Sequence, residues 1–172
     1  IIPQLQIVAD LLDSANRQIN MGDIGFASLL VFNAAGAHAS AGGRLEVLRD
    51  YISNQVLDQQ MMQSMHVARQ QYEQLQQQID DASNAIKDYP KTTGTFHIIA
   101  NTVRTIVNKI LDALGAVAQR ADELLKSTGQ IAAEAARTPI RAANVGIIAI
   151  AAVLIILAIG IARGTAGARI QI

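Results

Sequence analysis

Apolar residues recur three or four positions apart along most of this chain, and that spacing predicts a protein built from helices. The first such stretch has its apolar positions at Leu5, Val8, Leu12, Ala15 and Ile19. Pro3 suits the first turn of a helix, whereas Gly22 and Gly25 interrupt the pattern. We therefore expect an amphipathic N-terminal helix over residues 1–22.

The strongest periodicity starts at Met61, where the apolar positions alternate between steps of four and three residues for almost four heptads. The positions of this first stripe are Met61, Met65, Ala68, Tyr72, Leu75, Ile79, Ala82 and Ile86. Two apolar positions in seven make a narrow stripe. Such a stripe favours a coiled-coil seam over the alternative, the broader face of a helix on a globular core.

A second stripe follows a turn signal, because Pro90 disfavours helix at Tyr89 and Gly94 adds another break. Its positions are Phe96, Ile99, Val103, Ile106, Ile110, Leu114, Val117, Ala121 and Leu124, continued by Thr128, Ile131 and Ala135. The spacing is heptad-like except for two successive steps of four, which locally shift a supercoil. This stripe predicts a second long helix.

Charge and turn length favour pairing of the two long helices. Residues 44–88 carry four basic and seven acidic side chains, whereas residues 91–141 carry seven basic and four acidic ones. The net charges of minus three and plus three attract, and a short connection makes the helices antiparallel neighbours. We expect a long, coiled-coil-like hairpin over residues 44–137, with its turn near residues 89–94.

Residues 142–162 form a stretch of 21 residues without a charge. As a helix it would be about 30 Å long, which matches the hydrocarbon core of a bilayer. Arginines suited to lipid headgroups flank it on both sides, at Arg137, Arg141, Arg163 and Arg169. We interpret it as a transmembrane helix followed by a short tail, residues 163–172; the alternative is a helix buried in a large soluble core.

A second uncharged stretch covers residues 24–43 and is rich in glycine and alanine. Small residues at four-residue spacing allow helices to approach closely inside a bilayer. Three interpretations are open for this stretch. It spans the membrane, it is an interfacial or re-entrant segment, or it is a small-residue helix buried in a protein assembly. Asn33 and His38 are its candidate lumen or interhelix polar residues, because polar groups inside a membrane commonly have functions. If the stretch is buried in protein instead, His38 is a core residue whose hydrogen bonds are made within the protein.

Composition excludes several functional classes. The net charge is zero and aromatic residues make up 3% of the chain, which argues against sequence-specific nucleic-acid binding. The absence of cysteine excludes disulfides, thiol catalysis and cysteine-based zinc sites. Neither a nucleophile–base motif nor a phosphate-binding loop occurs. We therefore expect no catalytic residues, no metal site and no cofactor.

Two paired helices leave part of the second stripe's wide apolar face uncovered. The residues that widen it are Ile98, Val107, Leu111 and Leu125. Further copies or partner helices would bury this surface, so we expect a homo-oligomer or a subunit of a larger helical complex.

The sequence thus predicts an all-α membrane protein: a helical hairpin, one strong C-terminal transmembrane helix, and a weaker N-terminal membrane or buried helix. The expected function is that of a non-enzymatic structural or channel-forming subunit of a membrane-spanning or membrane-penetrating assembly. Phage DNA-delivery, virion membrane and secretion machinery are examples of such assemblies. The alternatives are an α-helical pore-forming toxin and a membrane-anchored coiled-coil adaptor. The expected location is a membrane, and the lipid bilayer is one partner.

Overall fold

The computed structural model describes residues 1–91 and 93–135, and over these ranges the protein is helical and has no strand. The elements are α1 (Ile2–Met21), α2 (Ile24–Tyr51), the π-helical turn η1 (Ile52–Val56), α3 (Gln59–Lys87) and α4 (Thr93–Ala135). The prediction of an all-α protein is confirmed. The expected transmembrane helix at 142–162, its four flanking arginines and the tail at 163–172 lie outside the described residues.

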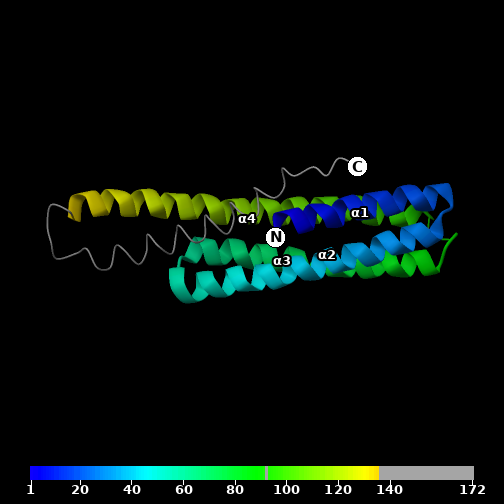
Figure 1. The fold of residues 1–172 in the computed structure, drawn as a ribbon, viewed down its shortest axis with the longest axis horizontal. Helices are drawn as coiled ribbons and strands as arrows, with labels where there is room; N and C mark the ends of the chain where they lie inside the picture. The colour runs from blue at the N-terminus through cyan, green and yellow to red at the C-terminus, as the bar shows by residue number, and fades with distance from the viewer. Residues whose placement is uncertain (92, 136–172) are drawn as a thin grey trace.

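The four α-helices run alternately up and down and form an elongated bundle (Figure 1). α1 packs against α2 and α4, and α3 packs against the same two helices from the other side. α1 lies along only part of the bundle, whereas α4 projects beyond the turn between α2 and α3 (Figure 1). The bundle therefore has a four-helix part, a three-helix part and a projecting end of α4.

Local chemistry explains where the helices begin and end. Gly22 ends α1 with a positive φ of 82°, a conformation that glycine adopts without a steric penalty. The Asp23 carboxylate then accepts a hydrogen bond from the Phe26 backbone N–H at 3.0 Å and caps α2. Asp58 caps α3 in the same way, with 2.9 Å to the Met61 N–H.

The boundary between the second and third helices differs from the expected one. We expected separate segments over 24–43 and 44–88, but α2 continues through Gly42 and Gly43 and the chain turns at Leu57 instead. Glycine inside a helix costs only about 1 kcal/mol, which tertiary packing overcomes. Leu57 adopts a left-handed conformation with φ 54°, an unusual state for leucine that the sequence pattern does not reveal.

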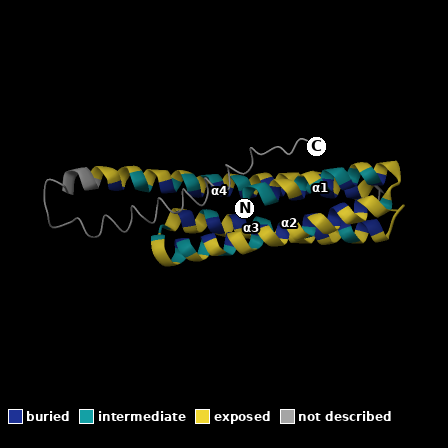
Figure 2. Cartoon of the chain, viewed as in Figure 1, coloured by how far each residue is buried: buried dark blue, intermediate teal, exposed yellow. Residues whose placement is uncertain are grey.

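The core is made of the apolar stripes that the sequence contains. All five apolar positions of α1 are buried, and so are most stripe positions of α3 and α4 (Figure 2). α1 and α2 cover the α3–α4 pair within the same chain, and Val107 is buried although we expected another copy to cover it. Ile98 stays exposed. Leu111 and Leu125 are partly buried. Helices of the same chain therefore cover part of this face, and the expected oligomer stays a prediction.

Candidate functional site

The two polar residues singled out within the uncharged stretch lie in different environments. His38 is 3% exposed and faces α3, whereas Asn33 is exposed on α2. The structure thus places His38 in the interface between α2 and α3, where its partners belong to the same chain. Asn33 remains available to a partner outside the described residues.

His38 and Tyr72 hold each other from opposite sides of the α2–α3 interface. Their rings are stacked, with centroids 3.9 Å apart and planes 9° from parallel. His38 Nε2 lies 3.2 Å from the backbone oxygen of Tyr72, and since a carbonyl accepts, this nitrogen carries the proton and donates it. In return, the Tyr72 hydroxyl donates to the backbone oxygen of His38 at 2.8 Å and lies 3.2 Å from Nδ1. The pair forms a reciprocal clasp between the two helices.

Gly42 makes room for this clasp. A β-carbon at position 42 would lie 2.1 Å from the Tyr72 hydroxyl oxygen and 2.7 Å from Cζ, which is closer than real side-chain contacts. The tyrosine ring cannot easily move aside, because the His38 ring stacks on it and its hydroxyl is bonded to α2. Glycine at this position is therefore explained by close packing, one turn of helix after His38.

Burial changes the protonation of both clasp residues. Desolvation lowers the pKa of His38, and the hydrogen bond to the Tyr72 backbone and the charge of Asp80 only partly oppose this effect. Desolvation raises the pKa of Tyr72, with the hydrogen bond to the backbone at Gly42 acting in the other direction. His38 and Tyr72 are therefore both neutral near pH 7, which suits a stacked pair in an apolar interface.

The lowered pKa of His38 predicts a loss of stability in mild acid. The unfolded chain binds the proton more readily than the bundle, so stability is fully present above the ordinary histidine pKa of 6.5 and falls as the pH drops from there towards the lowered pKa of His38. Urea unfolding between pH 7 and about pH 5, above the usual range of carboxylates, measures this slope. His38→Phe keeps a stacked ring but removes the proton-binding group, so its slope should be smaller. An equal slope in the wild type and His38→Phe would contradict this cause.

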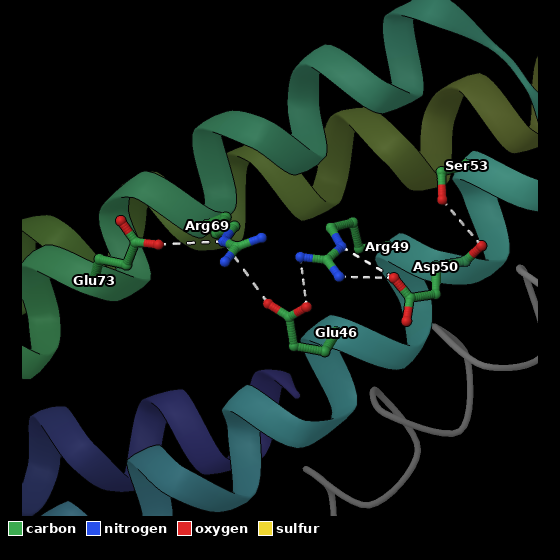
Figure 3. A network of polar contacts seen from close by, with 6 residues as sticks. All are labelled: Glu46, Arg49, Asp50, Ser53, Arg69 and Glu73. Atoms are coloured by element: carbon green, nitrogen blue, oxygen red, sulfur yellow. Dashed lines mark hydrogen bonds and ion pairs between the residues drawn. The ribbon is translucent and has the colours of Figure 1, made fainter.

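A network of ion pairs continues the α2–α3 interface towards the turn (Figure 3). Arg49 pairs with Glu46 at 2.6 Å and with Asp50 at 2.8 Å, all within α2. Arg69 of α3 bonds to Glu73 at 3.2 Å and reaches Glu46 at 3.8 Å, and this last contact joins the two helices. These side chains are well exposed, so water screens them and the network orients the helices more than it stabilises them.

The predicted seam positions are in the core of the four-helix bundle. Those buried are Met61, Met65, Leu75, Ile79, Ile86, Ile99, Val103, Ile106, Ile110, Leu114 and Val117, while Tyr72 and Leu124 are partly buried. They contact α1 and α2 as well as each other, since one continuous cluster contains residues of all four helices. The two stripes thus form part of a core that all four helices share, not a separate coiled-coil seam between α3 and α4 alone.

Besides the Arg69–Glu46 contact, two ion pairs between helices were also not identified from the sequence. Arg120 of α4 bonds to Asp58 at 3.1 Å, so the cap of α3 is also tied to α4. Arg104 of α4 pairs with Asp13 of α1. Both pairs join residues more than 60 positions apart, and a pattern of spacings along one helix carries no signal for such contacts.

In the described residues, the polar contacts of His38 and of the ion pairs join helices to one another. Over residues 1–91 and 93–135, no group of three or more histidine or acidic side chains is placed to hold a metal ion. The stretch Ile24–Val56 is long and apolar enough to cross a membrane by composition, and a third of its most apolar window is buried in the bundle. Core helices of soluble proteins and signal sequences have the same composition.

Comparison of the chain with protein-family models, with curated proteins and with solved structures finds no match.

Proposed function

We propose that this chain is a non-enzymatic helical membrane protein that oligomerises as a structural or channel-forming subunit of a membrane-spanning or membrane-penetrating assembly. The observation that carries the proposal is the 21-residue uncharged segment 142–162. It follows a helix that projects away from the bundle (Figure 1). A charge-free segment of this length has the properties of a membrane span.

The projecting end of α4 gives the proposal its geometry. The Asp58–Arg120 pair marks the level at which α3 begins, and α4 continues from there to Ala135. Those 15 further residues extend the helix by about 22 Å. In the proposed arrangement the bundle is held off the bilayer by this rod, with residues 136–141 as the connection. The clasp between His38 and Tyr72 keeps α2 within the bundle.

Replacing Ala152 with arginine tests the membrane anchor. An arginine at the middle of a span costs at least about 2.5 kcal/mol, so the variant should integrate poorly into membranes. Resistance to alkaline extraction of a membrane fraction measures integration. Ala116→Arg is the matched control because Ala116 is exposed on α4, and it should integrate normally. Equal integration of the wild type and Ala152→Arg would contradict the proposal.

One observation favours a second candidate, an α-helical pore-forming protein that is soluble first and inserts later. α2 has the composition of a membrane span, yet the bundle buries its inner side and the His38–Tyr72 clasp ties it to α3. An inserting helix stored in a folded bundle would have this environment. Release of a dye from liposomes by protein prepared without detergent would favour this candidate, whereas a protein that needs detergent at every stage would favour the first.

A further inference from the structure

The outward side of α2 carries a stripe of exposed residues. Its members, which we name the α2 outer stripe, are Gly25, Leu29, Phe32, Gly36, Ala39, Gly43 and Val47. Three of them are large, and Leu29 is 50%, Phe32 75% and Val47 71% exposed. No charged residue lies between Asp23 and Arg44. An exposed apolar strip of this length is unusual for a helix that only faces water.

The glycines of this stripe do not accommodate a neighbouring side chain of the described bundle. Among the residues that the structure describes, a β-carbon at Gly36 or Gly43 would meet no atom within 4 Å, and one at Gly25 would meet only an Asp23 oxygen at 3.9 Å. Each glycine in a helix interior costs up to about 1 kcal/mol relative to alanine. The neighbouring Gly42 differs because it accommodates Tyr72. Close approach of a surface from outside the bundle would account for glycine at the stripe positions.

We propose that the α2 outer stripe binds the same stripe of a second copy of this chain, antiparallel, about a two-fold axis through Gly36. That symmetry places Leu29 of one copy opposite Gly43 of the other. It also places Phe32 opposite Ala39 and Ser40, and Val47 opposite Gly25. Every large side chain then faces a small one, so two helices can approach evenly along the stripe. A parallel pair would instead bring Phe32 against Phe32 and glycine against glycine.

The chain's own C-terminal segment fits this surface less well than a second copy. The described part of α4 reaches Ala135, about 22 Å beyond the level where α3 begins. Residues 136–141 span at most about 21 Å when fully extended. A helix over 142–162 is about 31 Å long and would therefore reach no further back than about Gly36. Beyond that point only residues 163–172 would reach Leu29 and Phe32, and they carry the charges of Arg163 and Arg169, which do not suit an apolar surface.

This inference rests on the proposed function, which has the chain oligomerise. It adds the surface through which two copies bind and their relative orientation. The antiparallel arrangement puts the two projecting α4 ends at opposite ends of the pair. Each pair would thus carry one apolar C-terminal segment at either end, an arrangement that can connect two bilayers. A single pair of helices buries less area than the roughly 800 Å² per partner of a stable complex, so the association should depend on protein concentration.

Cysteine cross-linking tests the orientation cleanly because the chain has no cysteine of its own. The full chain in mild detergent is made as two single variants, Leu29→Cys and Gly43→Cys, and oxidised separately or mixed. Antiparallel pairing predicts a disulfide-linked dimer in the mixture and little in either variant alone. Cross-linking of Leu29→Cys with itself and no excess in the mixture would overturn the proposed orientation.

A charge in the stripe tests the surface independently. Phe32→Lys should raise the dimer dissociation constant at least tenfold in a dilution series followed by native mass spectrometry. Met62→Lys is the matched control, because Met62 is an exposed apolar residue on α3, and it should not change the dissociation constant. If an oligomer forms and Phe32→Lys leaves it unchanged, the α2 outer stripe is not the interface, although the proposed oligomeric function is not contradicted. A chain that is monomeric at every concentration and needs no detergent would overturn both proposals.

Discussion

Replacing Leu75 with aspartate is expected to abolish cooperative folding of the helical bundle. Leu75 is fully buried on α3, and truncating such a side chain costs about 2–5 kcal/mol before any charge is buried. A carboxylate without a partner in the same place adds a further penalty. Domains of this size are stable by only about 5–15 kcal/mol, so a large fraction of the variant should be unfolded at 25 °C. Circular dichroism during thermal melting measures the loss.

Gln74→Asp is the matched control for this change. It introduces the same side chain one residue earlier on the same helix, at an exposed position with no acidic residue three or four positions away. Its melting curve should stay close to that of the wild type. An unchanged melting curve for Leu75→Asp would show that this position is not part of a packed core, and would contradict the four-helix arrangement.

Alanine substitutions at two adjacent glycines are expected to act in opposite directions. Gly42→Ala should destabilise the bundle by about 1–3 kcal/mol, because its β-carbon would overlap the clasped ring of Tyr72. Gly43→Ala should stabilise it by up to about 1 kcal/mol, because alanine favours the helix and nothing lies within 4 Å. Urea unfolding of both variants measures the difference. At high protein concentration Gly43→Ala should also weaken the proposed pairing.

Removing the ring tests the cause of the Gly42 effect. In a Tyr72→Ala background the overlap is gone, so Gly42→Ala should become neutral or stabilising. Stabilisation by Gly42→Ala in the wild-type background would contradict the close contact between α2 and α3. A loss of stability that persists without the ring would assign the cost to another contact.

The helices and their buried sides were predictable because both follow from spacing along one helix. Leu5, Leu75 and Ile110 occur at three- and four-residue steps, and each is buried where the period predicts. The turn before the last helix was also predictable, since Pro90 lies between α3 and α4. Gly94, the second expected break, lies instead in the first turn of α4. These features depend on neighbours in the sequence.

The end of α2 was not predictable in the same way. Leu57 has no intrinsic preference for a left-handed conformation, and Asp58 is one of many acidic residues that can cap a helix. The uncharged stretch stops before Arg44, which suggested a boundary where the helix in fact continues. Packing of α2 against α1 and α3 determines that outcome, and it involves residues far away in the sequence.

The candidate site was predictable in part. His38 was identified because it is polar within an uncharged stretch, but its partner Tyr72 is 34 residues away and was assigned only to the apolar stripe. A single sequence does not indicate that two rings stack or that Gly42 accommodates one of them. The clasp needs the antiparallel placement of α2 and α3, which only the fold supplies.

The most direct test of the account is the mass of the particle formed by the full chain, measured by native mass spectrometry with and without mild detergent. A membrane-anchored subunit that pairs through α2 predicts a defined homo-oligomer that is recovered only with detergent. A stable monomer recovered in water would contradict the proposed membrane assembly. It would instead favour the second candidate, a pore-forming protein that is soluble first and inserts later.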